Sequence, residues 1–349
     1  MKQTFERIEA MLAKVDFETV WPGFAPCDYV LFQDGKAYMS GEEIPWDARF
    51  MGCTSMEYEG RQIATWRMDM LDMGKPEAKR SKEPDWERHV AGIVHEMFHA
   101  FQENSGETRH IDEFALFMYP RDLDNFQLKM VENTLLVRAF ESKNLADLQQ
   151  FVAMRKARER VVGADMLRQE MLGETHEGMA KYAELMALRQ LSEQKFAEDV
   201  QECIADALAP ATILKPRWVS YDVGCLIALA MQAVGIDFYH ALNETKTLFE
   251  LIPHSKNDVE TQFDARREEL AAKFDEIRTS GKLVEIDTQI AGFNPMGMER
   301  VGDEIWCNGF VCLSAPTGET EQLVLQGQIL LVMHAGEANA VKAYYIIER

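Results

Sequence analysis

Two histidines and a glutamate stand at HExxH spacing in the segment DWERHVAGIVHEMFHAFQ, as His95, Glu96 and His99. On a helix, side chains four residues apart lie one turn apart on the same face, so both imidazoles can reach one metal ion. Neutral imidazole suits zinc, and the neighbouring glutamate can act as a base on a zinc-bound water. In a chain of this length and composition, fewer than about 0.03 HExxH motifs are expected by chance. We therefore predict one catalytic Zn²⁺ on this helix.

The residues around the motif favour a helix. Asp85 can cap its first turn. Ala91, Val94, Phe98 and Phe101 recur at helical spacing and form one apolar stripe, which the two histidines flank. The alternative interpretation is a core helix whose histidines are satisfied by hydrogen bonds alone.

A third ligand is needed to define the class of site. A metzincin would have a histidine six residues beyond His99, but that position is Ser105. The helical segment ADMLRQEMLGETHEGMAKYAEL offers acidic candidates instead. These are Glu170, Glu174, Glu177 and Glu184. The alternative is that all four form a solvated acidic face.

At this point the sequence resembles the gluzincin zinc metallopeptidases, in which a glutamate from a second helix, often in an EGxA setting, joins HExxH. Residues 177–180 supply that setting here. The resemblance implies Glu177 as the third ligand, and Glu174 is the alternative. It also implies that the small residues Gly178 and Ala180 let the two helices approach closely.

One position departs from the gluzincin pattern. Several gluzincins carry an acidic residue four places after the ligand glutamate, which orients a histidine, whereas this chain has Lys181 there. The partner of that histidine is then expected to be Glu174 or Glu184. His176 points about 100° away from Glu177 around a helix and is not expected to be a ligand.

A second segment, YDVG at 221–224 followed by CLIALAMQAVG, resembles the YxxG that opens a helix in aminopeptidase-type gluzincins. The resemblance implies that the Tyr221 hydroxyl donates to the oxyanion of the reaction. The alternatives are an ordinary aromatic residue at a helix start, and His240 as the donor. The GxMEN signal of aminopeptidases is absent, which favours a peptidase in general over an aminopeptidase.

The elements that must position these residues predict an α+β fold in three parts. Residues 1–84 are expected to be the β-rich start of the catalytic unit, with a hairpin turn at Asp34-Gly35 and a strand over 61–70. Residues 85–280 read as a helical metallopeptidase domain. Residues 281–349, with short β-branched runs between glycines, predict a small β module.

Helical spacing extends beyond the motif. Residues 1–16 predict an amphipathic helix, and residues 255–280 predict a charged one. The polar insert at 107–165 keeps apolar residues at helical spacing, so we expect folded helices in it and not a linker.

Composition narrows the range of partners. The net charge of −21 repels nucleic acid and anionic membranes. The six cysteines form no CxxC pair, which is typical of reduced thiols. The first residues do not resemble a signal peptide, and no run of 18 apolar residues occurs. We expect a cytoplasmic protein.

These observations predict a zinc-dependent metallopeptidase that hydrolyses short peptides. Zinc is expected on His95, His99 and Glu177, with Glu96 as general base and Tyr221 as oxyanion donor. The alternatives are a zinc hydrolase of a non-peptide substrate and a catalytically silent zinc-binding regulator. The sequence leaves open the substrate, the choice between end and internal cleavage, and the oligomeric state.

Overall fold

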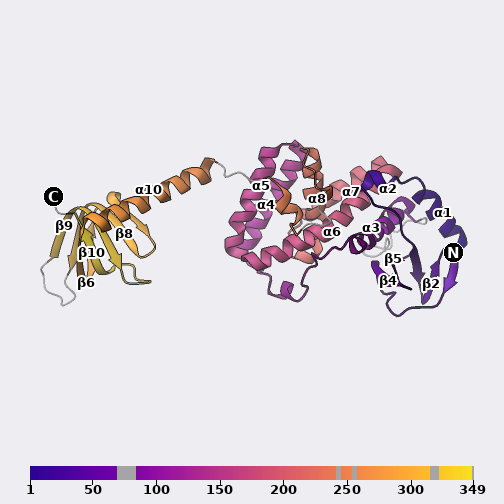
Figure 1. Cartoon of the computed structure of the whole chain (residues 1–349), viewed down its shortest axis with the longest axis horizontal. Helices are drawn as coiled ribbons and strands as arrows, with labels where there is room; N and C mark the ends of the chain where they lie inside the picture. The colour runs from indigo at the N-terminus through magenta and orange to yellow at the C-terminus, as the bar shows by residue number, and fades with distance from the viewer. Residues whose placement is uncertain (69–83, 241–244, 254–257, 315–321, 348–349) are drawn as a thin grey trace. The chain divides into compact units, whose positions relative to one another are not determined.

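A computed structural model describes the chain in two compact units, Met1–Ser255 and Lys256–Arg349 (Figure 1). The described residues are 1–68, 84–240, 245–253, 258–314 and 322–347, with only the backbone described at 258–264. Helices and sheets are both present, which confirms the predicted α+β class. Within those ranges, no helix combines the length and apolar character that a membrane span requires.

The first unit begins with two helices and a five-stranded sheet. The bounds are α1 Lys2–Leu12, α2 Phe17–Val20, β1 Tyr29–Gln33, β2 Lys36–Met39, β3 Glu42–Ile44, β4 Thr54–Tyr58 and β5 Arg61–Arg67. The strand order is β3-β2-β1-β5-β4. Only the β1–β5 pair is parallel, and the other pairs are antiparallel. Strand β4 is therefore an antiparallel edge strand.

Turn residues set the register of this sheet. Asp34 and Gly35 both have positive φ and connect β1 to β2 as a two-residue turn, which confirms the predicted hairpin. Glu59 and Gly60 turn β4 into β5 in the same way. The strand predicted over 61–70 ends at Arg67, and its last two positions lie outside the described residues.

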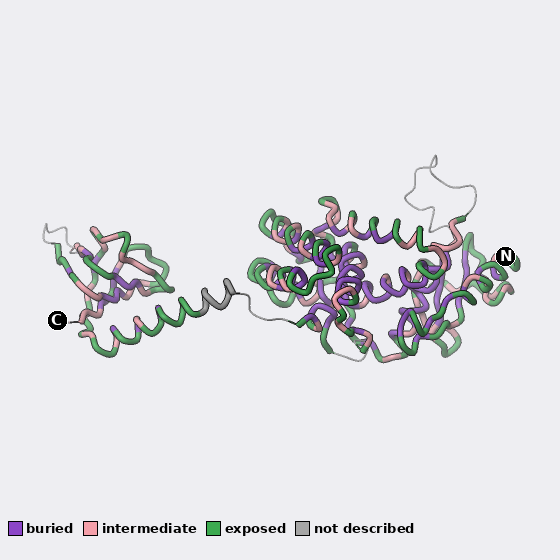
Figure 2. Tube along the Cα trace, turned by 90° about the horizontal axis from the view of Figure 1, so that it is seen from above, coloured by how far each residue is buried: buried purple, intermediate pink, exposed green. Residues whose placement is uncertain are grey.

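The other regular elements described in the first unit are helices. Their bounds are α3 Trp86–Asn104, α4 Leu123–Ser142, α5 Leu145–Val162, α6 Ala164–Leu191, α7 Glu193–Ala207, α8 Pro216–Ala233 and α9 Leu248–Leu251, with a 3₁₀ helix η3 at Ala115–Met118. The insert at 107–165 is therefore folded, as predicted. Helix α6 is buried along most of its length (Figure 2).

The sheet packs directly on α3, the helix that carries HExxH. Gly92 faces the Trp66 indole of β5, and a Cβ at this position would lie 2.1 Å from the ring. The same indole donates a hydrogen bond from Nε1 to Nδ1 of His89, over 3.1 Å. A glycine in mid-helix thus lets the sheet come close enough to hold α3 in place.

Helices α6 and α8 touch at a pair of glycines. A Cβ on Gly178 would lie 2.4 Å from the Cα of Gly224. The resemblance placed this close approach between the two ligand-bearing helices, whereas the structure places it between α6 and α8. The reason is that Gly178 follows Glu177 by about 100° around α6 and so faces a different neighbour.

Replacing Gly178 by alanine is expected to lower the free energy of unfolding by about 1–3 kcal/mol, because two backbones must separate to admit the methyl group. Gly173→Ala on the same helix is the matched control. Its closest neighbour is the flexible end of the Ile111 side chain, at 2.8 Å. Urea unfolding followed by helical circular dichroism measures both variants, and equal midpoints would contradict the expectation.

The described residues of the second unit form one long helix, a short 3₁₀ helix at Pro295–Gly297 and five strands. The bounds are α10 Asp258–Ser280, β6 Lys282–Phe293, β7 Met298–Val301, β8 Glu304–Ser314, β9 Gln322–Met333 and β10 Ala340–Ile346. All strand pairs are antiparallel, and β6 pairs with both β10 and β8. The predicted carboxyl-terminal β structure is confirmed.

Helix α10 belongs with these strands and not with the helical domain predicted over 85–280. Leu270, Phe274 and Ile277 recur at helical spacing and are buried against Trp306 and Leu330 of the sheet. Hydrophobic contact of this kind, and not sequence continuity, determines which unit a helix joins. The division therefore falls at residue 255, and the predicted boundary at 280 is corrected.

Candidate metal centre

His95, His99 and Glu177 meet in the interior of the first unit. The two Nε2 atoms of the histidines are 3.1 Å apart, and Oε2 of Glu177 lies 3.2 Å from Nε2 of His99 and 3.9 Å from Nε2 of His95. Tetrahedral zinc with bonds of about 2.1 Å separates its ligand atoms by roughly 3.4 Å. All three residues are buried. Their spacing therefore fits a single metal ion.

Helix α3 brings the two imidazoles to this point as the sequence predicts. Its first turn is capped by Asp85, whose side chain accepts a hydrogen bond from the backbone N–H of Arg88. Val94 and Phe98 of the apolar stripe are fully buried, so the helix cannot rotate about its axis without exposing them. The side chains of His95 and His99 are 7% and 10% exposed, beside that stripe.

The alternative ligand, Glu174, is engaged elsewhere. It belongs to an ion cluster of three carboxylates and three cations, all at most 1% exposed. The members are Lys129, Glu132, Arg155, Arg158, Glu170 and Glu174. Its carboxylates lie close enough together for a metal, but lysine and arginine already neutralise them. The interpretation of these glutamates as a solvated face is therefore wrong, and Glu177 is the one that faces the Nε2 atoms of both histidines.

Each histidine has a partner on its outer nitrogen. Nδ1 of His95 lies 3.0 Å from Oε2 of Glu184, and Nδ1 of His99 lies 2.7 Å from Oε1 of Gln102. An Nδ1–H that donates in both rings leaves the Nε2 lone pairs free for a metal. Lys181, the residue that departs from the gluzincin pattern, holds Glu184 through an ion pair of 2.6 Å. Glu184, one of the two partners expected from the sequence, is thus the carboxylate that orients His95.

Glu184→Gln is expected to weaken zinc affinity by about 10–100-fold, because the amide orients His95 without the charge that raises its basicity. Glu193→Gln is the matched control, since Glu193 is exposed and pairs with Arg189 on the surface. Chelator competition measures both affinities. Equal affinity for zinc in both variants would show that Glu184 does not support the site.

The charges of the site favour a cation. Burial lowers the pKa of His95, but hydrogen bonds to Glu177 and Glu184 outweigh it and raise the pKa to about 10. Burial raises the pKa of Glu177, but hydrogen bonds from His176, His95 and His99 lower it well below its usual range. The surrounding carboxylates thus stabilise a proton on His95, and a metal ion bound at the same nitrogen would replace that proton.

Glu96 lies beside this cluster, and its pKa is shifted in the opposite direction from that of Glu177. Burial raises the pKa of its carboxyl, and the charges of His95 and His99 only partly offset that effect. A carboxylate that is harder to keep ionised is also a stronger base. Glu96 is thus suited to accept a proton.

Arg217 is a site residue that sequence reasoning missed. Its Nη2 lies 3.0 Å from Oε1 of Glu177, and its Nε lies 2.8 Å from Oε1 of Glu113. The pairing occupies one oxygen of Glu177 and leaves Oε2 for the histidines. The only sequence signal is that Arg217 precedes Tyr221 by four residues on one helix, which places both on one face.

Tyr221 reaches the site, but from a different helical position than predicted. Its ring stacks on that of His95, with centroids 5.8 Å apart. Burial and the charge of Glu177 raise the pKa of the phenol, so it stays protonated. Because Pro216 occupies the first turn of α8, the YxxG segment lies inside the helix and does not open it.

His240, the alternative donor, lies past the other end of α8. About 18 Å of helix separates the end of α8 from Tyr221. The His240 side chain is 53% exposed and faces Asp237. This position does not favour His240 as a participant in the site.

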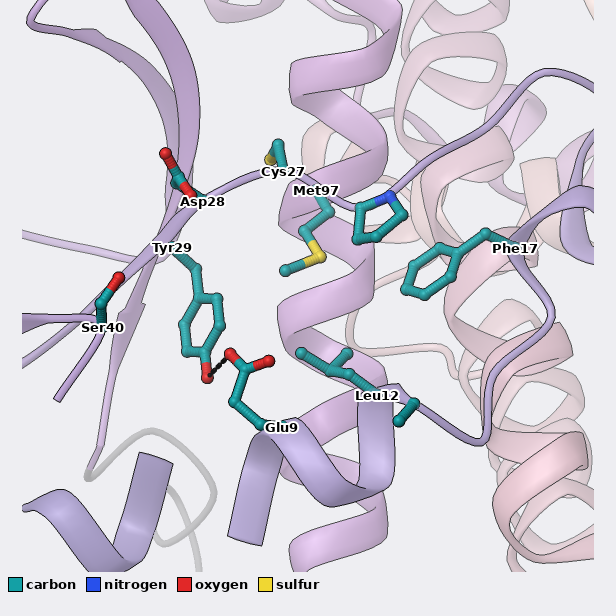
Figure 3. A pocket seen from close by; sticks show the side chains of 10 residues that line it. Glu9, Leu12, Phe17, Cys27, Asp28, Tyr29, Ser40 and Met97 are labelled. Atoms are coloured by element: carbon teal, nitrogen blue, oxygen red, sulfur yellow. Dashed lines mark hydrogen bonds between the residues drawn. The ribbon is translucent and has the colours of Figure 1, made fainter. Parts of the chain in front are cut away.

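Two hollows bear on the search for a substrate site. A cavity of about 150 Å³ is lined by His110, His176, Glu177 and Arg217 among others, and so opens beside the cluster. A larger one of about 380 Å³ is lined in part by Met97 of α3 (Figure 3). Its polar lining includes the Tyr29 hydroxyl, which donates to Glu9, and no member of the metal cluster lines it.

Comparison of the chain with protein-family models, with curated proteins and with solved structures finds no match. The structure itself provides buried histidines and a glutamate that could hold a metal ion.

Proposed function

We propose that this protein is a zinc metallopeptidase of the gluzincin type that acts on short peptides in the cytoplasm. The observation that carries the proposal is the convergence of His95, His99 and Glu177, with Glu96 next to the first histidine. A pure metal-binding module has no need of a base at that position. The six cysteines are all free, in agreement with a reducing compartment.

The residues of the chain have separate tasks in this proposal. His95, His99 and Glu177 would hold the zinc ion, which when bound lowers the pKa of water and polarises a carbonyl. Glu96 accepts a proton from the attacking water and returns it to the leaving amine. The Tyr221 hydroxyl donates a hydrogen bond to the carbonyl oxygen as negative charge develops there. Arg217 pairs with Oε1 of Glu177, the oxygen that does not face His95 and His99, and so keeps the carboxylate in one orientation.

The sheet supports a peptide substrate over other carbonyl compounds. Strand β4 packs against α3 and, among the described residues, pairs only with β5. Its outer edge can therefore add an extended peptide as a further strand. This backbone pairing would bring a peptide bond toward the helix that carries His95 and Glu96.

Tyr221→Phe is expected to lower kcat by about 10²–10³-fold, because it removes one donor to the oxyanion. Zinc affinity should not change, since the phenol is not a ligand. Tyr239→Phe is the matched control, because the Tyr239 hydroxyl contacts that of Tyr182 away from the cluster. An unchanged kcat for Tyr221→Phe would restore the interpretation of an ordinary helical aromatic.

Profiling a mixed short-peptide library by mass spectrometry tests the proposed activity. The zinc-loaded chain is expected to cleave peptides, and both the zinc-free chain and Glu96→Gln are expected not to. The cleavage positions show whether the enzyme counts from an end. A chain that holds zinc but cleaves nothing would contradict the peptidase and favour a non-peptide substrate or a regulatory role.

A further inference from the structure

Three further ligand side chains gather beside the metal cluster without belonging to it. Glu103 lies in the last turn of α3, His110 in the loop that follows, and His176 on α6. Nε2 of His110 is 3.7 Å from Oε1 of Glu103. One ligand atom from each of the three residues lies within 4.8 Å of the other two.

His176 has an open ligand position. Its Nδ1 faces Oε1 of Glu177 at 3.6 Å, whereas its Nε2 is buried with no hydrogen-bond partner among the described residues. An unpaired buried polar atom costs about 1–3 kcal/mol. The His176 ring is fixed by stacking on His99, with centroids 4.6 Å apart, so the nitrogen cannot easily turn away. A bound cation would satisfy it.

The other two ligands can close around such a cation. The side chains of Glu103 and His110 are 36% and 50% exposed. To bind the ion through Nε2, His110 would exchange its 3.2 Å contact with the backbone oxygen of Glu107 for the metal. Both His110 and His176 line the cavity of about 150 Å³, which gives an ion a way in. The net charge of −21 also concentrates cations at the surface.

We propose that Glu103, His110 and His176 form a second metal site, which binds a divalent transition metal such as zinc more weakly than the buried cluster. Two imidazoles and one carboxylate are a donor set that zinc accepts. The weaker binding follows from exposure, because two of the three ligands must be ordered when the ion binds. The site does not depend on the proposed peptidase activity.

Zinc titration of the whole 349-residue chain, without a tag, tests the second site by isothermal calorimetry together with native mass spectrometry. The wild-type chain is expected to bind two ions with distinct affinities, and His110→Ala is expected to lose the weaker event and keep the tighter one. His240→Ala is the matched control, since it removes another exposed histidine that faces a carboxylate. This control should still bind two ions.

A complementary variant separates the two sites. His95→Ala removes a ligand of the buried cluster and is expected to keep the weaker event. Circular dichroism checks that each variant is folded. A single ion in the wild-type chain, two ions in His110→Ala, or loss of both events in His95→Ala would overturn the proposal.

Discussion

Glu96→Gln is expected to reduce kcat/KM by at least about 10²-fold while the protein keeps its zinc. The amide has nearly the shape of the carboxylate but cannot accept a proton, so the variant removes the base and little else. Metal affinity should be kept, because His95, His99 and Glu177 are the residues that converge. The measurement is turnover of the best library peptide together with zinc content.

Glu87→Gln is the matched control for this variant. Glu87 lies on the same helix but in its first turn, where it pairs with Lys195 near the surface. Full activity is expected from the control. Full activity in Glu96→Gln would refute the role of Glu96, and loss of zinc from that variant would show that the glutamate acts as a ligand instead.

Arg155→Met is expected to lower the free energy of unfolding by about 3–5 kcal/mol, the largest stability effect that the structure suggests. Arg155 is fully buried and pairs with Glu132 at 2.7 Å and with Glu174 at 2.8 Å. Methionine fills much of the volume but leaves these carboxylates with too little positive charge. Urea unfolding followed by helical circular dichroism measures the loss.

Arg138→Met is the control, because it removes an exposed arginine from an ion pair. Arg138 is 59% exposed, and its partner Asp147 keeps a hydrogen bond from the Ser142 hydroxyl, so its loss should cost no more than about 1 kcal/mol. Similar losses in Arg155→Met and Arg138→Met would show that the buried cluster contributes no more than a pair with an exposed arginine.

The same cluster predicts a dependence on pH. Burial raises the pKa values of Glu132 and Glu170, but the charges of Arg158, Lys129 and Arg155 outweigh it and lower them, that of Glu170 to about 2. Carboxyls with lowered pKa stabilise the fold above their unfolded pKa of about 4.3, and this contribution is lost as pH falls toward 2. The difference in the free energy of unfolding between the wild-type chain and Arg155→Met is therefore expected to become smaller as pH falls. A constant difference would contradict this assignment.

The parts of the site that could be predicted from the sequence are those that depend on local spacing. The spacing of His95 and His99, one turn apart, is fixed by helix geometry. Asp85 caps the same helix by accepting a hydrogen bond from the backbone N–H of Arg88, three residues later. The hairpin at Asp34-Gly35 needs only residues that tolerate positive φ. Each of these features involves residues at most four positions apart.

The features that were missed depend on partners far along the chain. Arg155 and Arg158 look the same in a sequence whether they are solvated or buried, and only the packing of α4, α5 and α6 brings them to Glu132. Arg217 reaches Glu177 from 40 positions away. Gly178 was correctly expected at a close helix contact, but its neighbour on α8 could not be read from local pattern.

Helix α10 illustrates the same limit for domain boundaries. Its charged sequence has helical spacing and continues the helical region, so the sequence places it in the domain over 85–280. Its few apolar residues, such as Phe274, are nevertheless buried on the strands that follow. The partner against which an amphipathic helix packs depends on which apolar surface lies near it in the fold. The spacing of apolar residues along the helix does not give this information.

Anomalous diffraction at the zinc edge, from crystals of the chain loaded with one equivalent of zinc, would locate the metal itself. One dominant peak is expected, bonded at roughly 2.0–2.2 Å to His95, His99 and Glu177. A dominant peak elsewhere, or none between these three side chains, would refute the proposed metal centre.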